Sequence, residues 1–163
     1  DVATALSGTD KPFTLIMVAQ KSANSGSDTL ASLGSSSADT HYHEVQTNGT
    51  TTFDSVRRGG DTATTANGGT PDTSPHILSV VFSGTTTSIY VDGLNVASAE
   101  AQDNAAVTVN QFAVGALFVT SASQFAATDI SEYILTTDAL GDDDRETQER
   151  RLSQKFGISI HHA

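Results

Sequence analysis

The 163-residue chain is long enough for one domain with a core, although apolar residues make up only 37% of it and charged residues 17%. Its formal net charge of −11 argues against nucleic-acid binding, which needs a basic surface. The chain has no cysteine, which excludes disulfides, thiolate metal sites and cysteine nucleophiles. No apolar run is long enough to insert into a membrane.

The first half of the chain predicts strands that are separated by polar loops. Residues 13–19 form a β-branched, apolar run preceded by Pro12, and they predict the most deeply buried strand. Further strands are predicted at residues 29–33, 41–47, 51–57 and 62–65. Asn48 and Gly49 lie between two of these runs, and this pair favours the positive φ angles of a type I′ hairpin turn.

The second half contains a hairpin that is encoded locally. Residues 88–91 and 94–99 flank Asp92 and Gly93, a pair that accepts positive φ at both turn positions and should set the strand register. Two apolar residues of the first strand share one face, and Tyr90 lies on the other. Strands are also predicted at residues 76–82, 107–117 and 130–135, for roughly ten to twelve in all.

The C-terminal part predicts one helix, over residues 145–156. Three aspartates precede it, Arg and Lys residues lie towards its end, and Gly157 follows. Carboxylates at the start, cations near the end and a glycine just past it are typical of a helix with matched termini. A narrow apolar stripe should dock this helix, and it consists of Leu140, Leu152 and Phe156.

Three segments carry a resemblance to a known family. They are "PFTLIMVAQ" (12–20), "PHILSVVFSGTTTSIYVDGLNVAS" (75–98) and "ISEYILTTDALGDDDRETQERRLSQKFGI" (130–158). The order of elements resembles the concanavalin A-like jelly roll, specifically the laminin-G-like modules of phage virion and bacterial secreted proteins. The resemblance implies an all-β fold: a two-sheet antiparallel jelly-roll sandwich with one C-terminal α-helix, as a single domain over residues 1–163 of a larger polypeptide or assembly.

The positions that match the family are scaffold positions and therefore bear on the fold more than on a ligand. They are Tyr90, Asp92, Gly93, Glu132, Leu140, Arg145, Glu149, Leu152, Lys155, Phe156 and Gly157.

Catalysis by glycoside hydrolysis would need two carboxylates facing each other across a cleft. Jelly-roll glucanases carry theirs in a Glu-x-Asp-x-Glu pattern, and none of the five glutamates here lies in such a pattern. Glu132, within "DISEY", comes nearest to it. We interpret Glu132 as a strand residue bonded to neighbouring backbone, and we expect no enzymatic activity.

One strand and its partner predict a polar binding surface. His41 and His43 share a strand face, a spacing that can chelate a metal or supply a lyase base. Tyr42 points to the opposite face, and Arg57 and Arg58 on the paired strand could neutralise a uronate. The competing interpretation is an ordinary polar strand edge facing solvent. We select these five residues as the candidate binding surface.

Loop oxygens could hold a calcium ion, which the resemblance makes plausible. The candidate ligands are Asp28, Asp61, Asp72, Asp103 and Asn104. No Asp-x-Asp-x-Asp loop is present, however, and acidic loops are usually only solvated. No other cofactor is predicted.

We therefore interpret the chain as a non-catalytic surface-binding or assembly module. A phage virion component, either a capsid decoration or part of a tail fibre, is favoured, with weak glycan recognition because the chain has no Trp. The alternative is a carbohydrate-binding module of a secreted bacterial polysaccharide-degrading or adhesion protein, and an active hydrolase or lyase comes third. The expected partners are virion or surface-protein subunits, further copies of the chain, or glycans, at an extracellular or virion surface.

Overall fold

The computed structural model describes residues 2–22, 26–102 and 106–162. Two five-stranded antiparallel sheets form most of it. The first, here the helix-bearing sheet, comprises β2 (Phe13–Lys21), β7 (His76–Phe82), β8 (Thr86–Val91), β9 (Leu94–Ala101) and β14 (Thr128–Thr136). The second, here the opposite sheet, comprises β3 (Asp28–Ser35), β4 (Ala38–Asn48), β5 (Thr52–Gly59), β6 (Thr62–Gly68) and β11 (Gln111–Val114).

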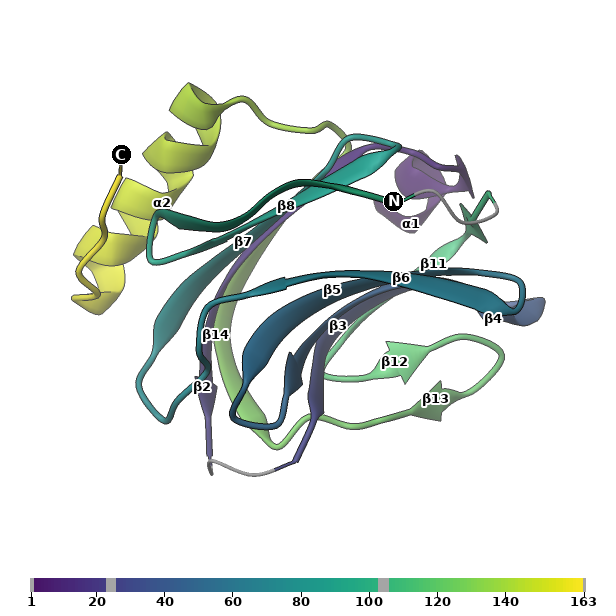
Figure 1. Cartoon of the computed structure of the whole chain (residues 1–163), viewed down its shortest axis with the longest axis horizontal. Helices are drawn as coiled ribbons and strands as arrows, with labels where there is room; N and C mark the ends of the chain where they lie inside the picture. Colours follow the sequence, from purple (N-terminus) through teal and green to yellow (C-terminus); the bar gives the residue numbers. More distant parts are fainter. Residues whose placement is uncertain (1, 23–25, 103–105, 163) are drawn as a thin grey trace.

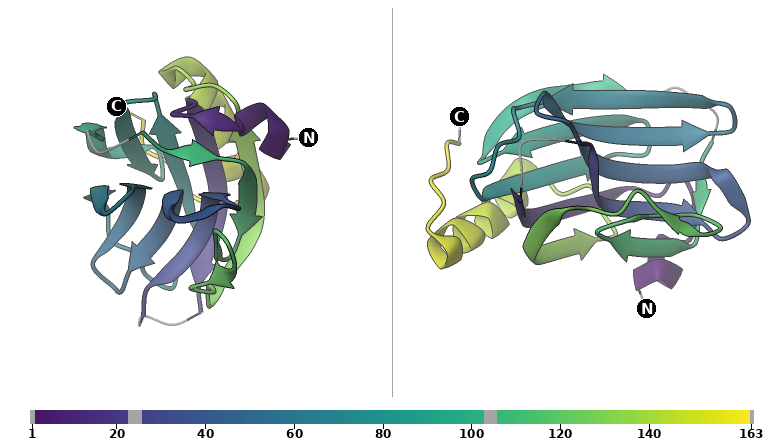
Figure 2. Two further views of the ribbon diagram at one scale, coloured as in Figure 1. Left: turned by 90° about the vertical axis from the view of Figure 1, so that its right-hand side faces the viewer. Right: turned by 90° about the horizontal axis from the view of Figure 1, so that it is seen from below.

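Shorter elements complete the described chain. They are the pair β1 (Gly8–Thr9) and β10 (Thr108–Val109), the pair β12 (Leu117–Phe118) and β13 (Ala122–Ser123), and the helices α1 (Val2–Leu6) and α2 (Asp142–Phe156). The two sheets face each other, and α2 lies against the outside of the helix-bearing sheet (Figures 1 and 2). The predicted jelly-roll sandwich with a C-terminal helix is therefore confirmed. Neither helix is long and apolar enough to cross a membrane.

Strand β2 is buried on both of its faces, which explains its unbroken apolar sequence. Leu15 and Met17 point between the sheets into the main core, whereas Ile16 and Val18 pack in the separate cluster under α2. A strand that is covered on both sides cannot alternate with polar residues. The order within the sheet, β14-β2-β7-β8-β9, places β2 between two partners.

The Asp92-Gly93 turn forms as the sequence predicts. Asp92 has φ 50° and Gly93 has φ 81°, with Val91 paired directly to Leu94. A side chain at position 93 would also place its Cβ 2.6 Å from the His162 ring, so only glycine fits there. The turn fixes only the near end of the hairpin, because the register shifts twice further along, between positions 87 and 90.

Two predicted boundaries in the opposite sheet are wrong. The loop after Asn48 has three residues, because Asn48 pairs with Thr52, so the turn is one residue longer than a type I′ turn. The expected strand at residues 107–117 is divided among β10, β11 and β12, which belong to three different sheets. Asn110 lies between the first two, and Gly115, with φ 76°, turns the chain before the third. An apolar pattern does not record where a chain leaves one sheet for another.

Helix α2 begins at Asp142, three residues before the predicted start, so the three aspartates occupy its first turn. Gly157 adopts the left-handed conformation, with φ 69°, and its N–H donates to the Ser153 carbonyl at 2.8 Å. Leu152 is fully buried against the helix-bearing sheet, and Leu140 and Phe156 pack beside it. The predicted docking stripe is confirmed.

Candidate functional site

His43 lies inside the sandwich and not on a binding surface. Its ring packs against Phe13 and Phe82, with ring centroids 5.4 and 4.4 Å away, and only 5% of the residue is exposed. Burial, reinforced by the positive charge of Arg57, lowers the His43 pKa to about 3. His43 therefore stays neutral, and its prediction as a surface ligand-binding residue is wrong.

Arg57 closes one end of the same interior. Its Nη2 lies 2.5 Å from Asp10 Oδ1, and its Nη1 donates to the Gln102 carbonyl at 3.1 Å. Asp10 Oδ1 also accepts the Val107 N–H at 3.0 Å. Burial alone would raise the pKa of Asp10, but the hydrogen bonds from Arg57 and Val107 outweigh it and lower that pKa. Arg57 is thus a structural cation, and its prediction as a surface residue is also wrong.

Tyr42 and Arg58 are directly paired on the outer face of the opposite sheet. Tyr42 is only 8% exposed, because it packs in a small apolar cluster with Val56, Leu117 and Val119. Its ring therefore offers no platform to a ligand. Arg58 is partly exposed and donates through Nε to the Gly60 carbonyl at 3.3 Å. His41, also partly exposed, accepts the Thr108 N–H through Nδ1 at 3.4 Å.

Asp28, the first predicted calcium ligand, is already matched by a cation from the chain. Lys21 Nζ lies 3.8 Å from Asp28 Oδ2 and donates to the carbonyls of Gly26 and Gly49 at 3.1 and 2.7 Å. The other carboxylate oxygen accepts the Ala127 N–H at 2.9 Å. The ammonium group thus supplies the positive charge among oxygens of the kind that calcium would use.

The remaining predicted metal ligands are not brought together. Asp61 is exposed in the turn between β5 and β6, whereas Asp72 accepts the Ser74 N–H and lies 3.1 Å from His76 Nε2. Asp103 and Asn104 lie outside the described residues. Within the described ranges, no group of three or more His, Asp or Glu side chains could hold a metal ion.

A polar pocket opens elsewhere, between the first turns of α2 and the β8–β9 hairpin. This helix–hairpin pocket has a volume of about 200 Å³ and is lined by Tyr90, Gly93, Asn95, Asp142, Arg145 and Glu146. The sequence analysis assigned three of these residues to the scaffold and none to binding. No local signal could have revealed the pocket, because its two walls lie about fifty positions apart in the chain.

Arg145 forms the buried base of this pocket. Its guanidinium carbon lies 3.6 Å from the centroid of the Tyr90 ring, and only 3% of its side chain is exposed. Its Nη1 contacts Glu149 at 2.6 Å, and its Nη2 contacts Asp142 at 3.2 Å and Glu146 at 3.6 Å. Burial alone would lower the Arg145 pKa, but Glu149, with smaller contributions from Asp142 and Tyr90, raises it above the usual value. The buried Nε has no hydrogen-bond partner in the described part of the chain.

Glu149 fixes this base to the rest of the molecule. It is fully buried, accepts the Ser79 hydroxyl at 2.6 Å and lies 2.8 Å from His162 Nε2. The neighbouring His161 N–H donates to the carbonyl of Asp92 at 2.7 Å. Helix, sheet, hairpin turn and C-terminal segment are thus held together beneath the pocket. A site supported in this way is held in one geometry.

The mouth of the pocket offers several kinds of polar group. Asn95 is exposed, the Asp142 side chain is 75% exposed and that of Glu146 is 20% exposed. The partly exposed Tyr90 places its hydroxyl 3.5 Å from Asp142 Oδ1. An amide, two carboxylates and an amphipathic ring can together bind a small ligand that both donates and accepts hydrogen bonds.

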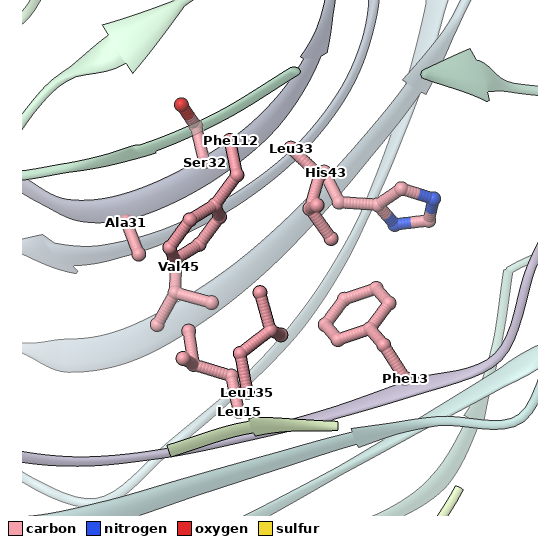
Figure 3. Close-up of a pocket in the computed structure, with 9 residues that line it drawn as sticks. All are labelled: Phe13, Leu15, Ala31, Ser32, Leu33, His43, Val45, Phe112 and Leu135. Atoms are coloured by element: carbon pink, nitrogen blue, oxygen red, sulfur yellow. The ribbon is translucent and has the colours of Figure 1, made fainter. Parts of the chain in front are cut away.

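The space between the sheets is, by contrast, filled. Figure 3 shows Phe13, Leu15, Val45, Phe112 and Leu135 converging there. The void that remains among them is about 10 Å³, roughly the room for a single water molecule. It is not a sugar site.

Comparison with known proteins gives matches of structure alone. No family model matches the chain, and no curated protein does. The CBM40 module of the Ruminococcus gnavus IT-sialidase, bound to α2,3-sialyllactose, matches with a TM-score of 0.67 and 12% identity. That match covers 82% of this chain and 80% of the module.

Whole sialidases match over a limited part of their length. The leech intramolecular trans-sialidase gives a TM-score of 0.68 at 15% identity, and Trypanosoma rangeli sialidase gives 0.61 at 16%. Each match covers 93% of this chain but 24% of the enzyme, so the chain spans about a quarter of these proteins. At such identities the likeness shows a lectin-type, concanavalin A-like fold. It gives no support to the laminin-G-like or phage part of the predicted resemblance.

Proposed function

We propose that the chain is a non-catalytic carbohydrate-binding module. A binding module, the CBM40 of a sialidase, matches it over most of both chains, whereas the enzymes match it over about a quarter of theirs. This supports the alternative of the sequence analysis, a glycan-binding module, over the virion component. An extracellular location is part of the proposal, because that is where most complex glycans are displayed.

The observation that carries the proposal is the helix–hairpin pocket. Its volume of about 200 Å³ is below the roughly 300–1,000 Å³ of sites for drug-sized ligands. It therefore suits one sugar unit of a glycan better than a long polymer. Asn95 and the carboxylates at its mouth can pair with hydroxyl groups, and Tyr90 supplies the apolar contact that a sugar ring needs.

The carboxylates with catalytic potential are engaged elsewhere. Glu132 bridges β14 to α2 through Arg151 at 2.8 Å and Lys155 at 2.5 Å. The hydrogen bonds of Lys155 and Arg151 lower the Glu132 pKa, so this group stays ionised and is unsuited to act as a general acid. The prediction that Glu132 bonds to neighbouring backbone is thus replaced by an ion-pair role.

Glu44 is a second candidate for a catalytic acid, because burial, and then the charge of Asp54, raise its pKa. A raised carboxyl pKa beside a second carboxylate is what a glycosidase acid requires. However, Glu44 and Asp54 are only 3% and 4% exposed, and the Thr29 hydroxyl donates to Glu44. Neither carboxylate reaches a substrate, which favours binding over hydrolysis.

The proposal is tested by NMR titration of the labelled chain with a panel of neutral and acidic oligosaccharides. We expect a bound glycan to shift the backbone amides of Gly93, Asn95 and Asp142. The Asn95→Ala variant should weaken binding at least about tenfold, whereas Asp61→Ala, in a distant exposed turn, should not. Absence of binding to any glycan would overturn the proposal.

A further inference from the structure

We infer that the helix–hairpin pocket selects neutral, hydroxyl-rich sugar units and rejects sugars that carry a carboxylate. This inference rests on the proposed glycan-binding function and names the class of ligand. It sets the chain apart from a structural neighbour that was solved with sialyllactose, an acidic glycan.

The charges in the pocket oppose an acidic ligand. Among the described residues that line it, Arg145 is the one cation, and three carboxylates lie within 4 Å of its guanidinium: Glu149, Asp142 and Glu146. A ligand carboxylate could pair with Arg145 only by displacing one of these groups and lying beside the others. Like charges placed together in a partly buried site are a strong source of discrimination. The net charge of −11 adds to this repulsion at longer range.

The hydrogen-bonding groups of the pocket favour a hydroxyl ligand. Asn95, exposed at the mouth of the pocket, offers an amide that can both donate and accept hydrogen bonds. Asp142 and Glu146 offer only acceptors when ionised. A sugar hydroxyl can pair with the Asn95 amide and donate to these two carboxylates without bringing a charge. A carboxylate cannot donate at all.

The cations that remain for an acidic sugar lie elsewhere. Within the described residues, Lys11 and Arg58 have no carboxylate within 4 Å, whereas the other six Lys and Arg side chains are ion-paired. Arg58 lies on the outer face of the opposite sheet, beside the buried Tyr42. Binding of an acidic glycan through Arg58 is thus the competing outcome, and it can be separated from binding in the pocket.

The experiment uses matched neutral and acidic probes on the whole chain. Methyl glucoside is compared with methyl glucuronide, methyl galactoside with methyl galacturonide, and lactose with α2,3-sialyllactose, by NMR titration. We expect a neutral member to shift the pocket amides, with a dissociation constant at least about tenfold below that of its acidic partner. The Asp142→Asn variant should reduce this preference, because the acidic probe should bind more tightly once that carboxylate is removed. Asp61→Asn, which removes the same charge from a distant turn, should leave the preference unchanged.

The outcomes separate the two claims. Tighter binding of an acidic probe at the pocket amides would overturn the selectivity and leave glycan binding intact. Acidic binding that is lost in Arg58→Ala, with no neutral probe in the pocket, would also overturn the selectivity while keeping a binding module. If none of the probes and none of the wider glycan panel binds, both claims fail.

Discussion

Two arginines are buried in the described part of the chain, and they lie in different layers of the sandwich. Arg57 and Arg145 are each 3% exposed or less, each lies over an aromatic ring and each contacts a carboxylate, Asp10 or Glu149 respectively. Arg57 lies between the two sheets, where packing excludes a ligand. Arg145 lies on the outside of a sheet, beneath a helix, where a pocket reaches it.

This difference teaches that burial and pairing do not by themselves distinguish a structural cation from one at a binding site. Both arginines combine burial, an aromatic ring and a carboxylate, but Arg145 has three carboxylates nearby, Arg57 has one, and the two lie in different layers. From sequence alone the two roles were predicted the other way round, with Arg57 in the binding surface and Arg145 in the scaffold. If the layer decides, the region around Arg57 and the region around Arg145 should respond independently to substitution.

The largest effect is expected from removing either guanidinium. Arg145→Ala leaves the fully buried Glu149 without its cation, and should reduce the free energy of unfolding by about 3–5 kcal/mol. Arg57→Ala should cost about 3 kcal/mol, because Asp10 keeps partial access to water. Urea unfolding measures both. Glycan binding, measured below the unfolding temperature, should survive in Arg57→Ala and be lost in Arg145→Ala, and loss in both would show that the regions are coupled.

The next effect is an acid destabilisation that arises beside Arg57. His43 in the unfolded chain takes up a proton near pH 6.5, but in the folded protein only near pH 3. Fewer protons bind to the folded state between these values, so stability falls as the pH drops through that window. The loss by pH 4 should be on the order of 3 kcal/mol. His43→Leu should reduce the dependence of the unfolding free energy on pH, measured by urea unfolding between pH 4 and pH 7. The matched His41→Leu variant should leave that dependence unchanged.

A smaller effect of opposite sign is expected beside the pocket. The hydrogen bond to Asp92 raises the His76 pKa and outweighs burial, with help from Asp72. The stabilisation is therefore complete below the unfolded pKa of 6.5 and is lost as the pH rises through the folded value. His76→Gln should cost under about 1 kcal/mol at pH 5.5, and less at pH 8.5. If the stability lost in His76→Gln were larger at pH 8.5 than at pH 5.5, this account would be contradicted.

The smallest effect is expected from calcium. Because Lys21 already lies among Asp28 and two loop carbonyls, neither millimolar calcium nor a chelator should change the unfolding temperature of the chain. A rise of more than about 2 °C in calcium, measured by differential scanning calorimetry, would reinstate the predicted metal site.

The features that the sequence predicted well are those encoded over short distances. The positive φ angles of Asp92 and Gly93, the two-sided burial of β2 and the left-handed Gly157 each follow from a few adjacent residues. Strand alternation also placed Tyr42 and His43 on opposite faces correctly. Alternation could not tell which face was inside, because both faces of β4 carry polar side chains.

The candidate site could not be predicted because long-range packing creates it. Asp10 reaches Arg57 from a segment 47 positions away, and no local pattern records the contact that pairs this buried arginine. The helix–hairpin pocket likewise depends on how α2 packs against the helix-bearing sheet. Its residues were visible in the sequence, but their shared cavity was not.

The irregular edges of the helix-bearing sheet have a consequence for concentrated solutions. The outermost strands are β14 and β9, and the register shifts where each joins its neighbour, at Ile130/Glu132 and between positions 87 and 90. A bulge twists an edge and interrupts its row of free peptide groups, which makes it a poor template for a strand from another molecule. Many copies could thus be displayed side by side without pairing through their edge strands into fibrils.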